Sequence, residues 1–157
     1  MEAQEVTAKR LKLELRLEQL KKIDYSKNNF LYFVKQMWPE FIAGAHHKII
    51  ADKLEGIATG ELKRLIVNMP PRHTKSEFAS YLFPAWMIGR KPKMKIIQAT
   101  HTTELAVSFG RKVKNLLERD DYKEIFLTRI CLLTVKHQAA GTQKLAVCIT
   151  PWALDQT

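Results

Sequence analysis

The chain has 157 residues, a length that suits one domain with a single modest core. Its 26 Lys and Arg residues outnumber 16 Asp and Glu residues, and the resulting formal net charge of +10 favours polyanionic partners. The 46 % of hydrophobic residues argues against a disordered chain. No apolar run comes near the roughly 18 residues that cross a bilayer, which argues against a membrane span. The two cysteines lack CxxC spacing, which argues against a disulfide scaffold.

Three helices are predicted in the N-terminal part of the chain. Residues 7–22 carry leucines at a strand-like period of two, but the intervening residues are strong helix formers. The length therefore favours an amphipathic helix that packs on the domain or on a partner. Residues 28–37 predict a short aromatic helix that ends before Pro39. Residues 45–58 place apolar side chains on one face, and Gly60 closes this third helix.

Two adjacent histidines, His46 and His47, stand near the start of the third predicted helix. Neighbouring residues on a helix point about 100° apart, so we do not expect the two rings to ligate one metal ion. We interpret them as a polar surface pair. The alternative is that one of them contacts a nucleotide.

Strands and helices alternate in the next part of the chain. We expect strands at 63–69 and 95–99, a loop at 70–76, and helices at 77–88 and 104–118. The first strand is a compact apolar run with β-branched residues, which predicts that it is buried. Pro84 should kink the helix that contains it, and Gly89 should stop that helix. This order predicts an α/β fold, with a parallel sheet and helical crossovers behind an N-terminal helical segment.

The loop at 70–76 ends in Lys75-Ser76 and opens a helix, as a phosphate-binding loop does. Phosphate oxygens require backbone N–H groups, a helix N-terminus, an ammonium group and a hydroxyl for Mg²⁺. The common pattern GxxxxGK followed by Ser or Thr has two glycines, and here Met69 and Thr74 occupy those positions. A left-handed backbone at Thr74 would cost about 1–2 kcal/mol.

Three motifs in this order carry a resemblance to a known family: PPRHTKSE at 70–77, FPAW at 83–86 and ATHTTELA at 99–106. Residues 28–126 resemble the N-terminal ATPase region of tailed-phage terminase large subunits, the motors that package DNA into proheads. The resemblance implies an incomplete P-loop NTPase of the ASCE or RecA-like type. It also implies ATP and Mg²⁺ as cofactors.

The resemblance also implies roles for single residues. Lys75 and Ser76 match the Walker A pair, with Ser76 on the Mg²⁺ ion. Arg72 matches an arginine that stabilises charge on the γ-phosphate and is the candidate catalytic residue; the alternative is a salt bridge. The nucleotide-binding set is Pro71, Arg72, His73, Thr74, Lys75, Ser76 and Glu77. Thr100, His101 and Thr103 match a segment that couples nucleotide state to DNA contact, and the alternative is that Thr102 or Thr103 caps the next helix.

Partners follow from the same resemblance. The family acts on double-stranded DNA with a portal protein and a terminase small subunit, as a homo-oligomeric ring in the host cytoplasm. The N-terminal residues carry acids and lack an apolar h-region, so we expect no secretory signal and no membrane partner.

The last stretch, 127–157, departs from the family pattern. A motor ATPase needs aliphatic residues followed by paired acids, but the one acid in this stretch is Asp155. The family's C-terminal nuclease of the RNase H type is also missing. We therefore expect three parts: an N-terminal helix at 1–27, a partial ATPase domain at 28–126 and a divergent tail at 127–157. The tail is either read out of frame or a genuine C-terminus with a strand at 145–150.

Two other functions remain open at this point. The chain can be a non-catalytic basic module that binds DNA or the motor's partners without ATP turnover. It can also be a helicase-like ATPase, although that class lacks the Pro-Pro-Arg-His loop. If it is a packaging ATPase, we expect this chain alone to hydrolyse little or no ATP, because the water-activating carboxylate is missing.

Overall fold

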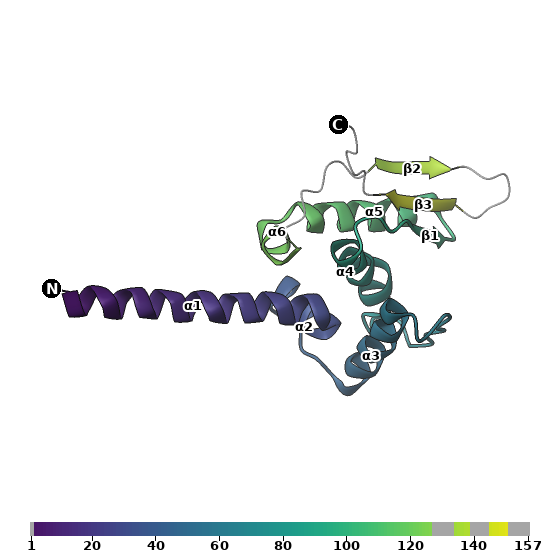
Figure 1. Ribbon diagram of the computed structural model, residues 1–157. Helices are drawn as coiled ribbons and strands as arrows, with labels where there is room; N and C mark the ends of the chain where they lie inside the picture. Colours follow the sequence, from purple (N-terminus) through teal and green to yellow (C-terminus); the bar gives the residue numbers. More distant parts are fainter. Residues whose placement is uncertain (1, 127–133, 139–144, 151–157) are drawn as a thin grey trace.

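Helices make up most of the molecule. The computed structural model describes residues 2–126, 134–138 and 145–150. In chain order its elements are α1 (Glu2–Asn28), α2 (Phe30–Met37), α3 (Ala45–Thr59), the π-helix η1 (Glu77–Leu82), α4 (Phe83–Arg90), β1 (Ile96–Thr100), α5 (Thr103–Glu118), α6 (Asp120–Phe126), β2 (Thr134–Gln138) and β3 (Leu145–Thr150). Figure 1 shows α1 extending away from the other helices, which gather near its C-terminal end.

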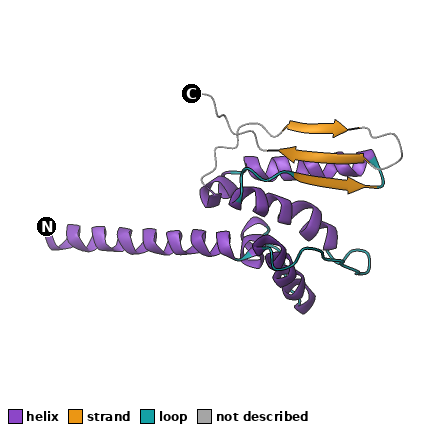
Figure 2. Cartoon of the chain, turned by 45° about the vertical axis from the view of Figure 1, so that its right-hand side comes forward, coloured by secondary structure: helices purple, strands orange, loops and turns teal. Residues whose placement is uncertain are grey.

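The three strands form one antiparallel sheet in the order β1–β3–β2. Val147 of β3 lies opposite Gln98 of β1 on one side and His137 of β2 on the other. Figure 2 shows the three strands side by side with α5 along them, in contact with β1 and β3. β3 coincides with the strand that one of the two interpretations of the tail placed at 145–150.

The predicted parallel sheet with helical crossovers is wrong, and the molecule is a helical body with a small antiparallel sheet. The physical reason is the choice of partner strand. The predicted first strand, 63–69, joins no hydrogen-bond ladder in the described part of the chain, and β1 pairs with β3 instead. Since β3 runs antiparallel to β1, the P-loop NTPase architecture is not formed.

Residues 63–69, predicted as a buried strand, form no strand and pair with none in the described part of the chain. Leu65, Val67 and Met69 are half-buried, whereas Ile66 exposes 86 % of its surface. The alternating burial typical of a strand is therefore present at 65–69, but the hydrogen-bond ladder to a neighbouring strand is absent from the described residues. β1, the expected neighbour in a parallel sheet, pairs with β3 instead.

The N-terminal helix is confirmed and is longer than predicted. Five of its leucines are 47–64 % exposed: Leu11, Leu13, Leu15, Leu17 and Leu20. A period of two places successive leucines about 200° apart around a helix, so they do not form the single apolar face that was predicted. The last turns contact the helical body, where the carbonyl of the buried Ser26 accepts a 3.0 Å hydrogen bond from the Trp86 indole.

Aromatic side chains dominate the core between α2, η1, α4 and α6. Phe30 packs edge to face on Phe78 and Phe83, with ring centroids 5.7 and 5.6 Å apart. Tyr122 is fully buried, and its hydroxyl donates a 2.7 Å hydrogen bond to the carbonyl of Ala85. Burial raises the pKa of Tyr122 far above its usual range, so this hydroxyl remains a donor at all ordinary pH values.

Helical backbone runs without a break from Lys75 to Arg90. Within it, η1 is a π-helix in which the Phe83 N–H donates to the carbonyl of Phe78, five residues back. This wider turn directly precedes Pro84, which has no N–H to continue the usual ladder. The irregularity predicted at Pro84 thus takes the form of a π-helix rather than a helix end.

Gly89 does not stop the helix, contrary to the prediction, because α4 continues to Arg90. A Cβ atom at Gly89 would lie 2.5 Å from the nearest atom of the Phe126 ring. Glycine is therefore required at this position for close packing of α6 on α4, and not for a turn.

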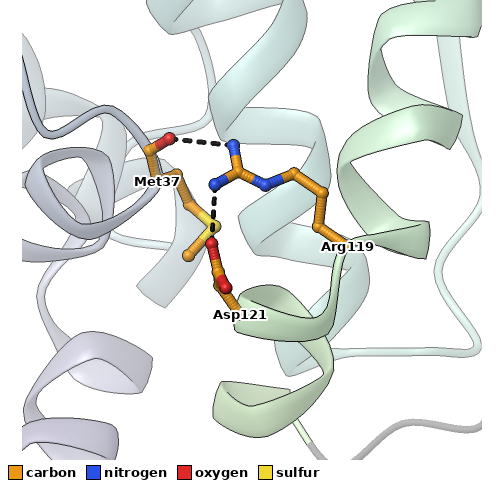
Figure 3. A network of polar contacts seen from close by, with 3 residues as sticks. All are labelled: Met37, Arg119 and Asp121. Atoms are coloured by element: carbon orange, nitrogen blue, oxygen red, sulfur yellow. Dashed lines mark hydrogen bonds and ion pairs between the residues drawn. The ribbon is translucent and has the colours of Figure 1, made fainter.

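Arg119 joins the end of α5 to the end of α2 (Figure 3). Its guanidinium donates to the Met37 carbonyl at 3.1 Å and pairs with the Asp121 carboxylate at 2.6 Å. Met37 is the last residue of α2, so Arg119 supplies a donor to a carbonyl that the helix end leaves unpaired.

Candidate phosphate-binding site

The loop that joins α3 to η1 reaches away from the helices and ends where helical backbone begins at Lys75 (Figure 2). Two of its residues have left-handed backbone: Arg72 with φ 65° and Thr74 with φ 57°. The Phe78 N–H donates to the Thr74 carbonyl at 3.0 Å, so the three amides before Phe78 are the donors that the first turn of a helix leaves unpaired. Such amides suit an anion.

Thr74 is at the position where the common phosphate-loop pattern has glycine. Its left-handed conformation is the one that glycine adopts without strain. For a β-branched residue this conformation costs roughly 1–2 kcal/mol. The loop therefore has the backbone that the pattern requires, although a glycine is missing.

The Lys75 side chain forms a hydrogen bond across the base of the loop. Its Nζ donates a 2.8 Å hydrogen bond to the carbonyl of Met69, which occupies the first glycine position of the pattern. The half-buried side chain thus crosses the base of the loop. A bound anion would have to compete with one neutral carbonyl for this ammonium group.

The seven predicted nucleotide-binding residues line one hollow of about 500 Å³: Pro71, Arg72, His73, Thr74, Lys75, Ser76 and Glu77. Arg72 and Ser76 are exposed there. No acidic side chain of the described residues forms an ion pair with Arg72, so the alternative of a salt bridge is not seen in that part of the chain. The Arg72 guanidinium is open to a ligand from solvent.

Glu77 is the one acidic residue of this set, and it is neutralised by a partner. Its carboxylate pairs with the Lys112 ammonium of α5 at 2.7 Å. The same ammonium lies 5.8 Å from the centre of the Tyr81 ring. The pair ties the start of η1 to α5 and reduces the repulsion that a carboxylate would exert on a bound phosphate.

His47 approaches the loop from α3, and the prediction of a polar surface pair is wrong for it. His46 is exposed, but His47 is only 7 % exposed. The Nε2 atom of His47 lies 2.7 Å from Oγ1 of Thr74 and 3.1 Å from Nε2 of His46. Burial lowers the pKa of His47, and the neighbouring His46 and His73 lower it further, so the ring is neutral near pH 7.

The predicted coupling segment lies at the junction of β1 and α5. Thr102 caps α5, since its side chain accepts from the Leu105 N–H at 3.4 Å, and the capping alternative is therefore confirmed. The Thr100 hydroxyl donates to the Thr102 carbonyl at 2.7 Å. Among the described residues, no hydrogen bond or ion pair joins Thr100, His101 or Thr103 to the loop at 70–76.

No family model, curated protein or solved structure matches the chain. Within the described ranges, no three or more His, Cys, Asp or Glu residues are placed to hold a metal ion. None of the helices described there is long and apolar enough to cross a membrane.

The sequence predicts the loop but not the contact of His47 with it. The spacing from Gly44 to His47 is that of a capping box, and the Gly44 N–H does donate to Nδ1 of His47 at 2.9 Å. The common form of the capping box has Ser or Thr at the N-cap and Glu or Gln three residues later. Gly44 and His47 depart from that form, so the sequence did not reveal their contact. The Gly-x-x-His spacing was the available signal for an inward-facing His47.

Proposed function

We propose that the loop at 70–77 binds the phosphates of a nucleoside triphosphate, with ATP and Mg²⁺ as the ligand. The observation that carries the proposal is the left-handed backbone of Thr74 directly before Lys75 and the start of a helix. A threonine held at a position that suits glycine indicates that the loop conformation itself is required. The unpaired amides of the first helical turn and the exposed Arg72 support the same ligand.

Each residue has a defined task in this proposal. Lys75 would exchange the Met69 carbonyl for phosphate oxygens, and Ser76 would offer its exposed hydroxyl to Mg²⁺ carried on the nucleotide. Arg72 would contact the terminal phosphate from solvent. Mg²⁺ would offset phosphate charge. The hollow of about 500 Å³ has the size of an ordinary small-molecule site, so these residues fit a triphosphate.

We further propose that the chain serves in a phage DNA-packaging motor of the terminase large-subunit kind. The support is the order of the three motifs at 70–77, 83–86 and 99–106 together with the net charge of +10. Double-stranded DNA, a portal protein and a small subunit would then be its partners. The assembly would be a homo-oligomeric ring in the host cytoplasm.

Calorimetric titration of the full chain with ATP in the presence of Mg²⁺ tests the nucleotide proposal. Lys75→Ala should weaken binding by about 10- to 100-fold, because a charge-assisted hydrogen bond contributes roughly 1.5–3 kcal/mol. Lys35→Ala is the matched control, since Lys35 is exposed on α2 and should leave the affinity unchanged. Equal affinities for the chain and the Lys75→Ala variant would contradict the proposal.

A non-catalytic basic module is the second candidate, and the net charge favours it. Such a module would bind DNA with an affinity that falls steeply with salt, since phosphate contacts release counterions. DNA binding that ATP and Lys75→Ala leave unchanged, in a chain that shows no heat of ATP binding, would support this candidate instead.

A further inference from the structure

We propose that His47 is a positioning residue that holds Thr74 in its left-handed conformation and thereby replaces the missing glycine of the phosphate loop. The inference rests on the proposed nucleotide function and deepens it. It assigns a task to a residue on α3, 27 positions before Thr74 and outside the loop motif.

The shorter hydrogen bonds around His47 have one consistent set of directions, in which Thr74 Oγ1 at 2.7 Å, and not His46 Nε2 at 3.1 Å, receives the ring proton. The Gly44 N–H can only donate, so Nδ1 of His47 accepts it at 2.9 Å. The neutral ring therefore carries its proton on Nε2 and donates it to Oγ1 of Thr74 at 2.7 Å. The Thr74 hydroxyl in turn donates to the His73 carbonyl at 2.7 Å. The Thr74 hydroxyl thus accepts one hydrogen bond and donates another, and the two together fix its side chain.

The His47 ring is itself fixed by aromatic neighbours. It stacks on Phe78 with ring centroids 5.2 Å apart and an interplanar angle of 26°. Phe41 contacts it edge to face, with centroids 4.7 Å apart. Because the ring is buried and its Nδ1 is held by α3, Nε2 is directed at Thr74 before any ligand arrives.

Glycine would not require such a contact. A glycine adopts positive φ without steric strain, whereas threonine needs an external group to favour that conformation. His47 and Thr74 should therefore be coupled: the value of the histidine contact should depend on the presence of threonine. A merely structural role of His47 in the core predicts no such dependence.

Three substitutions separate these possibilities. His47→Phe keeps a ring against Phe78 but removes the donor. His47→Gln keeps a donor near the position of Nε2. Thr74→Gly removes the need for the contact. Lys48→Ala, the exposed next residue on α3, is the matched control.

The test measures Mg²⁺-ATP affinity by calorimetry. His47→Phe should weaken binding about five- to tenfold in the natural chain, with partial recovery in His47→Gln. In the Thr74→Gly background His47→Phe should change the affinity less than twofold, and Thr74→Gly alone should bind at least as tightly as the natural chain. Equal losses in both backgrounds would overturn the proposal.

Thermal unfolding without ligand gives the second measurement and separates the two proposals. His47→Phe should lower Tm more in the natural chain than in the Thr74→Gly background. If the chain binds no ATP but the Tm values are coupled in this way, the nucleotide function fails and the positioning role stands. Additive Tm shifts would refute the positioning role, whatever the ATP titration gives.

Discussion

At the scale of single residues, surroundings decide what a side chain does. His47 and His46 are neighbours in the sequence, yet one is buried beside the loop and the other is exposed. Thr74 has the left-handed backbone that suits glycine, and its hydroxyl is hydrogen-bonded to Nε2 of His47. The sequence correctly identified Thr74 as the unusual position. It did not indicate the compensating residue, because that residue comes from another helix.

The lowered pKa of His47 predicts how stability depends on pH. The unfolded chain takes up a proton at this ring near pH 6.5, and the folded chain does so only at lower pH. The free energy of unfolding therefore decreases as the pH falls from 6.5 through the folded-state pKa of His47. Above pH 6.5 the contribution of His47 to the free energy of unfolding is constant. Tm should fall more between pH 7.5 and 5 in the natural chain than in His47→Phe. Identical pH profiles would contradict this.

Gln98 predicts a stabilising substitution. It is buried on β1, and both polar atoms of its amide lack a hydrogen-bond partner among the described residues. An unsatisfied buried polar group costs about 1–3 kcal/mol, so Gln98→Met should raise the free energy of unfolding by that order. Urea denaturation measures the change. The exposed Gln19→Met is the control, and a loss of stability in Gln98→Met would mean that the amide has a partner.

At the scale of elements, local signals predicted the helices up to α5, missed α6, and often gave wrong helix ends. The capping residue of α5 and the glycine that closes α3 were found from sequence because caps act within one turn. Gly89 was misread because the same residue type serves turns and close packing. Its role depends on Phe126, which is 37 positions away in the sequence.

Close packing at Gly89 predicts that alanine is harmful there. Alanine favours a helix over glycine by about 1 kcal/mol, but a Cβ at 2.5 Å from the Phe126 ring forces α6 to shift. Overpacking of this kind costs about 1–3 kcal/mol, so Gly89→Ala should lower the free energy of unfolding. Denaturant titration measures the change.

Gly56→Ala is the matched control for this substitution. Gly56 also lies within a helix, but its nearest contact is the end of the Leu62 side chain at 3.1 Å, which can move. We expect it to be close to neutral. Combining Gly89→Ala with Phe126→Leu should recover part of the loss, and a loss of the same size in the double variant would refute the packing explanation.

At the scale of the whole molecule, the helical body positions the loop and the strands do not. His47 of α3 contacts Thr74 of the loop, and Lys112 of α5 pairs with Glu77 at the start of η1. The antiparallel sheet lies against α5 and contributes β1, whose end carries Thr100. The proposed phosphate-binding loop is thus combined with an architecture other than the parallel sheet that its motif predicted.

The chain alone should hydrolyse little or no ATP. The sequence of 127–157 holds one acid, Asp155, and no aliphatic run followed by paired acids to activate water. A phosphate-release assay on the purified chain should give a rate equal to that of Lys75→Ala. Turnover that depends on Lys75 would show that another carboxylate serves as the base.

The sequence by itself predicted the helices up to α5 but not α6, the position of the loop and, as one of two alternatives for the tail, the strand at 145–150. These follow from spacing, caps and turn residues within a few positions of one another. Tertiary structure alone decided that β3 pairs antiparallel with β1, that 63–69 has no ladder in the described part of the chain, and that His47 faces Thr74. The physical reason is that hydrogen-bond ladders and buried contacts need partners from distant segments, and short-range periodicity does not specify which segments meet.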